Sequence, residues 1–144
     1  MYTGIKHLHS FLPYLLLAAL VITIIIFAIK MSKGSAYTAA DKRLSLITLI
    51  LAHLQFVFGL VLYFISPVSK AALTAETTMS DATNRLYAVE HPLTMLVAIV
   101  LITIGYSKAK RKEMSSAKFK TVAIFFAIAL ILALVRIPWN VWPA

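Results

Sequence analysis

The sequence predicts an all-α integral membrane protein, a four-helix up-down-up-down bundle that forms one transmembrane domain over residues 1–144. Two observations lead to this fold class. Hydrophobic residues make up 61% of the chain and charged residues only 13%, which leaves too little polar surface for a soluble domain of this size. The apolar residues also gather in four long runs, and a bilayer core about 30 Å thick requires roughly 20 helical residues.

The predicted membrane helices cover residues 9–30, 43–66, 83–107 and 119–139. The first two contain apolar runs that are long enough to span a bilayer. The first is expected to be retained, because its run exceeds the 7–15 residues that are typical of a signal-peptide core. The third run is short and is expected to extend back to about residue 84. Asp41 and Asp81 are the expected N-caps of the second and third helices.

The formal net charge is +9, and its distribution indicates an orientation. Lysine and arginine concentrate in the first and third connectors, without interleaved aromatic residues, so a nucleic-acid partner is not expected. The second connector is poor in basic residues. By the positive-inside rule, the first and third connectors are cytoplasmic and both termini are external. The predicted location is a bacterial cytoplasmic (inner) membrane, where lipids surround the helices.

Three histidines are the candidate ligands for a haem or a metal ion. His53 lies within the second run, His91 precedes a proline in the third, and His9 lies at the start of the first. A neutral imidazole inside lipid needs a partner, and histidine is a common axial ligand of haem iron. Simpler alternatives stay open. His53 can bond a neighbouring helix through Gln55 or a threonine hydroxyl, and His91 and His9 can be interfacial residues.

Heights above the cytoplasmic ends of the helices limit which histidines can share one ion. At 1.5 Å per residue, His53 lies at roughly 14 Å, His91 near 22 Å and His9 near 30 Å. The pairs His53–His91 and His9–His91 are both compatible with one ion, whereas His9–His53 is not. Pro92 removes the helical donor to the carbonyl of Ala88, so we expect a kink beside His91.

Charged residues are expected at the same outer level. Arg85 and Arg136 can each pair with Glu90 or bind an anionic ligand group such as a haem propionate. Glu90 is the only carboxylate that the sequence analysis places near the membrane. The chain has no cysteine, which excludes disulfides, iron–sulfur clusters and cysteine-ligated zinc. Phosphate-binding, dinucleotide-binding and hydrolase motifs are absent from the sequence, so an electron-transfer or accessory subunit is favoured over a stand-alone enzyme.

The segment Lys6–His9 (Lys-His-Leu-His) resembles the amino-terminal Lys-x-x-His pattern of several small bacterial haem-associated membrane families, including HemJ-like, CopD-like and SirB-like proteins. Together with Ala52–Gln55 and Val89–Pro92 it is similar to four-helix cytochrome b-like membrane proteins. The resemblance implies a b-type haem that is ligated by histidines on facing helices. Protoporphyrinogen oxidation is not carried over, because the further polar groups of HemJ-like proteins have no counterpart that we can place here.

The predicted function is therefore a membrane-embedded b-type haem protein that mediates electron transfer, either alone or as a subunit of a respiratory or other membrane complex. His53 and His91 are the predicted ligands of haem b, His9 is the reserve ligand, and Arg85 and Arg136 lie near the haem. Two imidazoles fill both axial positions of the iron, which suits electron transfer better than oxygen binding. The expected electron donor is a quinol in the bilayer or a partner subunit.

Two alternatives remain open at this point. The chain can be a haem-free structural accessory subunit of a larger membrane complex, in which small residues serve helix–helix contacts with other membrane subunits or in a homo-oligomer. The second alternative is an external copper or zinc site, and its ligands would be His7, His9, His91 and Glu90.

Overall fold

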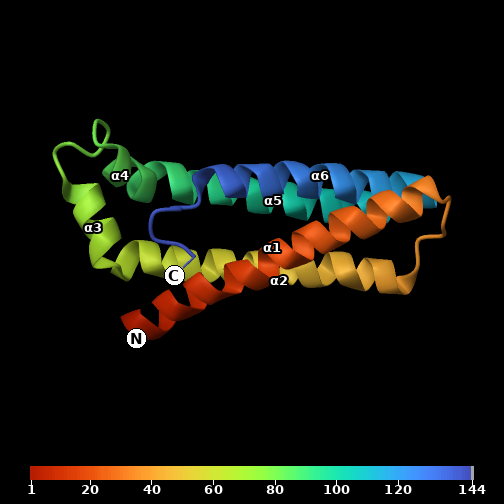
Figure 1. Cartoon of the computed structure of the whole chain (residues 1–144), viewed down its shortest axis with the longest axis horizontal. Helices are drawn as coiled ribbons and strands as arrows, with labels where there is room; N and C mark the ends of the chain where they lie inside the picture. The colour runs from red at the N-terminus through yellow and green to blue at the C-terminus, as the bar shows by residue number, and fades with distance from the viewer. Residues whose placement is uncertain (144) are drawn as a thin grey trace.

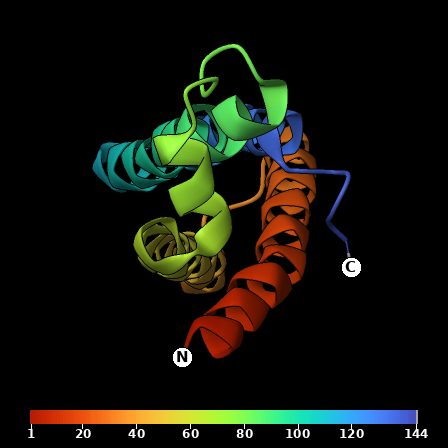
Figure 2. The same cartoon turned by 90° about the vertical axis from the view of Figure 1, so that its left-hand side faces the viewer.

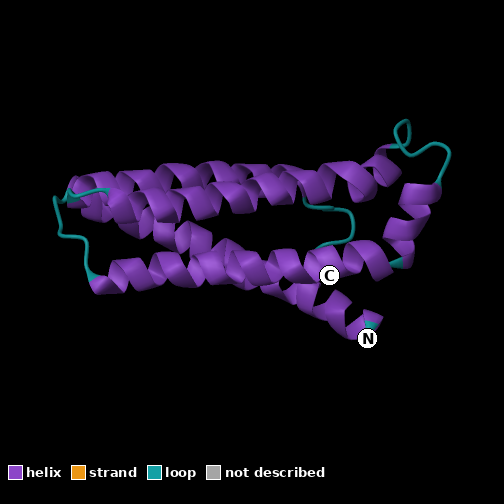
Figure 3. Cartoon of the chain, turned by 180° about the vertical axis from the view of Figure 1, so that it is seen from behind, coloured by secondary structure: helices purple, strands orange, loops and turns teal. Residues whose placement is uncertain are grey.

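The computed structural model describes residues 1–143, which are almost entirely helical and contain no strand. The four long helices are α1 (Tyr2–Ser32), α2 (Ala39–Ile65), α5 (His91–Arg111) and α6 (Ser115–Arg136). The shorter helices α3 (Pro67–Thr74) and α4 (Ala82–Arg85) and a π-helical turn η1 (Leu86–Glu90) lie between α2 and α5. Successive long helices run in alternating directions, as Figure 1 shows and the view from behind in Figure 3 repeats.

The two ends of the bundle differ. Both chain termini lie toward the end that carries α3 and α4, which we call the terminal end (Figure 1). The α1–α2 and α5–α6 connectors lie at the opposite end, which we call the connector end. α1 packs mainly on α2 and α6, and α5 packs mainly on α6 and α2. Figure 2 looks at the terminal end and shows that α1 runs obliquely to its neighbours.

Four helices are long and apolar enough to cross a membrane, namely Tyr2–Ser32, Ala39–Ile65, Ala82–Arg111 and Ser115–Arg136. The third of these joins α4, η1 and α5. The shortest has 22 residues, which at 1.5 Å per residue span about 33 Å against a bilayer core of about 30 Å. The outer faces are strongly apolar, with large aliphatic residues such as Ile25, Ile47 and Ile131 exposed. Extensive apolar surface is untypical of soluble monomers and consistent with a multi-pass membrane protein.

The helix boundaries differ from the predicted ones in ways that the sequence explains. The first helix begins at Tyr2 instead of residue 9, since nothing before Pro13 interrupts it. The last helix ends at Arg136 instead of residue 139, because Ile137 has extended backbone angles of φ −68° and ψ 136°. A residue that precedes a proline, here Pro138, disfavours the helical conformation.

One of the two predicted N-caps is confirmed. The Asp81 side chain accepts a hydrogen bond from the Asn84 backbone N–H at 2.9 Å and caps α4. The prediction that Asp41 caps α2 is wrong, because Thr38 is the N-cap and Asp41 is the third helical residue of a capping box. In that motif the side chain of the third residue reaches back to the N-cap backbone, so the helix begins at Ala39, two residues before Asp41.

The core is built from aromatic and small residues. Phe27, Phe119 and Phe126 are fully buried, and the rings of Phe27 and Phe119 meet edge to face with centroids 5.1 Å apart. At Gly105 an added Cβ would lie 2.5 Å from the Cβ of Phe125. Glycine therefore permits the close approach of α5 and α6, as is common in membrane bundles.

Candidate functional site

Pro13 exposes a backbone carbonyl in α1 near the terminal end. It has no N–H to donate to the carbonyl of His9, four residues earlier. α2 supplies the missing donor, because Nε2 of Gln55 donates to that carbonyl at 2.9 Å. The same nitrogen lies 3.1 Å from Nδ1 of the His9 ring. A single amide thus satisfies the interrupted backbone and orients the imidazole.

Pro92 creates the same gap in the third membrane helix. It leaves the carbonyl of Ala88 without its helical donor, as the sequence predicts. The hydroxyl of Tyr63, again from α2, donates to this carbonyl at 2.7 Å. The interruption takes the form of the π-helical turn Leu86–Glu90, directly before His91. Such turns are frequent at functional sites.

His9 and His91 meet across the bundle at this level. Their ring centroids are 6.3 Å apart and the ring planes are at 85°. The two rings come from α1 and α5, each of which packs mainly on α2 and α6. Both residues are only partly exposed. The structure therefore brings the reserve ligand His9, and not His53, beside His91.

The tautomer of His91 follows from its hydrogen bond. Its Nδ1 lies 2.8 Å from the carbonyl oxygen of Arg136, one of the carbonyls that the end of α6 leaves without an intrahelical partner. A carbonyl can only accept, so Nδ1 carries the proton and donates it. Nε2 of the neutral ring then has a free lone pair, the form in which histidine binds a metal.

His9 is held more tightly on its α2 side. A Cβ added at Gly59 would lie 2.8 Å from Cε1 of the His9 ring, so glycine leaves the space that the imidazole occupies. Oε1 of Gln55 is buried without a hydrogen-bond partner within residues 1–143. Because Nε2 of Gln55 can only donate, Nδ1 of His9 is the acceptor and the neutral ring carries its proton on Nε2. Turning the amide would set Oε1 against the His9 carbonyl, so this arrangement fits only that tautomer.

The predicted charged residues also gather beside His91. Nε of Arg85 lies 3.6 Å from Oε1 of Glu90, and Nε of Arg136 lies 3.7 Å from Oε2 of the same carboxylate. The sequence left two roles open for these arginines, pairing with Glu90 or binding an anionic ligand group, and in the structure both pair with Glu90. Two guanidinium groups share one carboxylate, so the cluster keeps an excess positive charge.

The carboxyl-terminal tail closes over this region. Nε1 of Trp142 donates to the carbonyl of Ser10 at 2.8 Å, and its ring lies against Tyr14 with centroids 4.9 Å apart. The tail is thereby tied to α1 one residue after His9. The sequence does not predict this contact. Gln55 was one of two alternative partners considered for His53, but it bonds His9. The four-residue spacing of His9 and Pro13 was the signal for the free carbonyl that Gln55 satisfies.

His53 lies elsewhere, on the exposed face of α2. Its Nδ1 is 2.8 Å from the carbonyl of Leu49, and its Nε2 is 3.5 Å from Oγ1 of Thr103. Thr103 follows His91 by twelve residues, or about 18 Å along α5. The structure therefore does not bring His53 and His91 together. The threonine contact is the one that the simpler interpretation of His53 expects.

The residues of the external metal site do not converge either. His7 is exposed near the start of α1, and Glu90 is engaged by two arginines. Within residues 1–143 no group of three or more His, Cys, Asp or Glu side chains is placed to hold a metal ion. His9 and His91 are thus a two-imidazole site without further ligands of these types.

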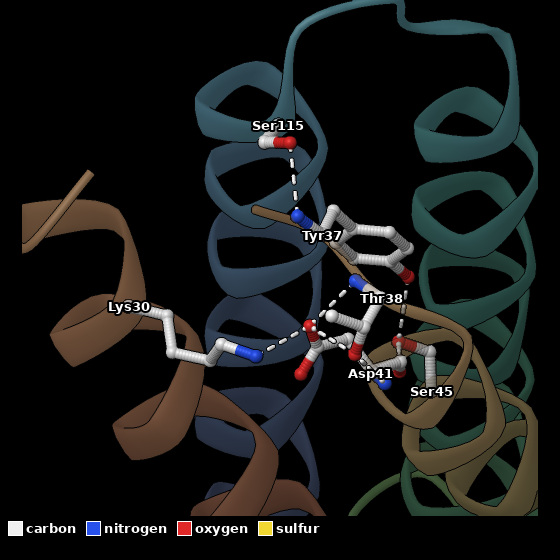
Figure 4. Close-up of polar contacts among 6 residues, drawn as sticks. All are labelled: Lys30, Tyr37, Thr38, Asp41, Ser45 and Ser115. Carbon is white, nitrogen blue, oxygen red and sulfur yellow. Dashed lines mark hydrogen bonds and ion pairs between the residues drawn. The ribbon is translucent and has the colours of Figure 1, made fainter. Parts of the chain in front are cut away.

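A second polar cluster lies at the connector end (Figure 4). Nζ of Lys30 is 2.6 Å from Oδ2 of the buried Asp41, and the same oxygen accepts from the Thr38 backbone N–H at 2.9 Å. The Tyr37 N–H donates to Oγ of Ser115 at 2.9 Å and ties the two connectors together. The statement that Glu90 is the only carboxylate near the membrane is wrong, because Asp41 is a second one. The sequence does not show that Asp41 is buried, because its partner Lys30 lies on a different helix.

Comparisons of this chain with protein-family models, curated protein sequences and solved structures find no match. The resemblance to HemJ-like, CopD-like and SirB-like proteins stays a prediction. The functional assignment therefore rests on the geometry of His9, His91 and their neighbours.

Proposed function

We propose that this chain is a membrane-embedded b-type haem protein that transfers electrons, with His9 and His91 as its axial ligands. The observation that carries the proposal is their ring separation of 6.3 Å. Two imidazole nitrogens on one metal ion, each about 2 Å from it, place the ring centres about 6 Å apart. This pair takes the place of His53 and His91, because His53 faces outward beside Thr103.

The residues around His91 match this group better than those around His9. Nε2 of His91 has a free lone pair because Nδ1 donates to the Arg136 carbonyl. A His9 that ligates through Nε2 would need a proton on Nδ1. Gln55 would then have to turn Oε1 toward that nitrogen and give up its bond to the His9 carbonyl. Hydrogen bonds of this kind orient ligand rings and raise their basicity. Gly59 keeps the space that the His9 ring needs.

A bound b-type haem supplies a one-electron centre. The residues of this chain hold and orient it. His9 and His91 are the residues that would hold its iron, and Arg85 and Arg136 are the groups that would meet its propionates beside Glu90. Glu90, next to His91, is the candidate acceptor for a proton from a quinol donor. A quinol in the bilayer or a partner membrane subunit is the proposed redox partner.

An absorption spectrum of the purified, dithionite-reduced protein tests the proposal. A b-type spectrum is expected, and carbon monoxide should change it little because no axial position is open. Absence of the spectrum after expression with added haem precursor would end the haem assignment. A large, rapid response to carbon monoxide would instead show an open axial position and rule out two-histidine electron transfer.

We further propose a bacterial cytoplasmic membrane with both termini external. Support comes from the separation of the two ends, because both termini lie at the terminal end and the basic connectors lie at the other. Fusing each terminus in turn to a reporter enzyme that is active only outside the cytoplasm tests the orientation. Both fusions should be active, and a cytoplasmic signal from either terminus would reverse it.

A haem-free accessory subunit is the second candidate, and one observation favours it. His53 exposes an imidazole on the outer face of an apolar helix, where a partner subunit or a second copy would cover it more favourably than lipid does. Small residues such as Ala52 and Ala98 are buried within this bundle, so they are not available to a partner. Co-purification of a stoichiometric partner without any haem spectrum would favour this candidate.

A further inference from the structure

A basic pocket lies at the connector end, on the outside of the α5–α6 hairpin. It has a volume of about 320 Å³ and is lined by lysines from both helices and by apolar residues of α6. Lys108 comes from the last turn of α5, Lys112 directly follows that helix, and Lys120 comes from the second turn of α6. Ile124 and Phe125 form its apolar part.

The three lysines carry charge that the chain does not neutralise. Within residues 1–143 the ion pairs involve Lys30, Arg85 and Arg136, and none involves the pocket lysines. Nζ of Lys108 lies 5.7 Å from the centroid of the Phe125 ring. Three ammonium groups around one pocket are strongly favourable for an anion.

Other basic residues of this hairpin are engaged away from the pocket. Nζ of Lys118 donates to the carbonyl of Ala109 at 3.1 Å, and Nζ of Lys110 lies 4.9 Å from the Tyr106 ring centroid. Not every pocket at the connector end is basic. A second pocket of similar size, about 330 Å³, lies between the two connectors and is lined by methionine, serine and glycine without a charged residue.

Below the lysines, large aliphatic residues are exposed on both helices. Ile124, Ile128 and Ile131 are exposed at helical spacing along α6, and Val97, Val100 and Ile104 are exposed along the adjoining part of α5. The surface therefore presents cations at the helix ends and an apolar track toward the middle of the helices. A phospholipid has the same order, with an anionic phosphate followed by acyl chains.

We infer that this pocket binds an anionic phospholipid, with the phosphate among Lys108, Lys112 and Lys120 and an acyl chain along the isoleucines of α6. Basic pockets between membrane helices on the cytoplasmic side are suited to anionic headgroups. The inference rests on the proposed membrane insertion and orientation. It does not depend on the haem.

Native mass spectrometry of the purified, delipidated full chain tests this inference. The protein is titrated separately with phosphatidylglycerol, with phosphatidylcholine and with inorganic phosphate. Phosphatidylglycerol should bind at least about tenfold more tightly than phosphatidylcholine, as expected for an anion among several cations, and inorganic phosphate should form no comparable adduct. Equal binding of the two lipids overturns the inference. Retention of inorganic phosphate as strong as that of the lipid shows a small-anion site and also overturns it.

Three combined variants test whether the pocket lysines are responsible for the preference for phosphatidylglycerol. The combined change Lys108→Gln, Lys112→Gln and Lys120→Gln should abolish the preference for phosphatidylglycerol. The combined change Lys33→Gln, Lys42→Gln and Arg43→Gln removes the same charge from the other connector and should keep the preference. Arginine at all three pocket positions should also keep it, which separates loss of charge from loss of folding. An unchanged preference in the glutamine variant, or loss of the preference in the other two variants, contradicts the assignment.

Discussion

The terminal end and the connector end both place polar groups among apolar helices, but they satisfy them differently. At the connector end, Oδ2 of Asp41 is bound by Lys30 and by Thr38. At the terminal end, Oε1 of Gln55 is buried without a hydrogen-bond partner within residues 1–143. Buried polar groups are normally satisfied. This unsatisfied atom supports the proposal that the terminal end holds a ligand, whereas the contacts of Asp41 join two helices at the connector end.

The prolines explain why the terminal end differs. Pro13 and Pro92 each remove a backbone donor within four residues of a histidine, so both helices need side-chain donors from α2. The connector end has no proline in its helices, and its polar residues cap helix starts instead. Prolines within helices thus produce the polar cluster at the terminal end, and capping residues at helix starts produce the one at the connector end.

The largest expected effect is loss of haem from His91→Ala or His9→Ala. Either change removes one of two axial ligands, so the b-type spectrum of the wild-type protein should disappear or become that of a weakly held, carbon-monoxide-reactive haem. His53→Ala and His7→Ala are the controls and should keep the spectrum. Loss of the spectrum in His53→Ala but not in His9→Ala would restore the pair that the sequence first suggests.

Asp41→Ala should give the next largest effect, on stability. The change removes hydrogen bonds from Lys30 and Thr38 to a charged group, and Lys30 is itself partly exposed, so the free energy of unfolding should fall by about 2 kcal/mol. Thermal or denaturant unfolding in detergent measures it, and the haem content of the remaining folded protein should be normal. Asp81→Ala, at an exposed N-cap, is the matched control and should cost about 1 kcal/mol. A selective loss of haem in Asp41→Ala would contradict the assignment of a structural role to the connector end and a ligand-binding role to the terminal end.

Gln55→Leu should weaken haem binding more than it weakens the fold. Residues that orient a metal ligand typically contribute 10- to 100-fold in affinity, and Gln55 contacts both the ring and the carbonyl of His9. Haem titration of the apoprotein measures the loss. Wild-type haem affinity in Gln55→Leu would show that the amide serves only the carbonyl exposed by Pro13.

The smallest expected effect comes from Tyr63→Phe. This change removes only the donor to the Ala88 carbonyl, and hydrogen bonds between membrane helices contribute about 0.6 to 1.7 kcal/mol. The free energy of unfolding should therefore fall by about 1 kcal/mol while haem affinity stays unchanged. Tyr63 and Gln55 both satisfy carbonyls freed by prolines, so the contrast between their variants isolates the contribution of the imidazole contact. Equal loss of haem in both would show that helix geometry, and not Gln55, orients the ligand.

Part of the candidate site was predictable from single residues. Pro92 predicts the free carbonyl of Ala88. The sequence also predicts that Arg85, Glu90 and Arg136 lie at one level, and the structure pairs both arginines with Glu90. The side chains that bond the carbonyls freed by proline could not be predicted. Tyr63 and Gln55 are among many polar residues, and the direction in which each one points depends on packing. Asp41 was misjudged for the same reason, since its ion pair joins two helices.

The sequence by itself determined the four long apolar helices and their alternation, because run length and composition are local properties of the chain. The heights counted from the sequence were wrong, because they put His9 about 8 Å above His91 and about 16 Å above His53. In the structure the rings of His9 and His91 are 6.3 Å apart, and His9 is bonded by Gln55, two residues from His53. Only the tertiary structure decided which faces point inward. His53 and Gln55 are two residues apart, about 200° around a helix with 3.6 residues per turn, so only one of them can face His9. In a membrane helix the lipid-facing side is as apolar as the core, and no periodicity in the sequence reveals which one does.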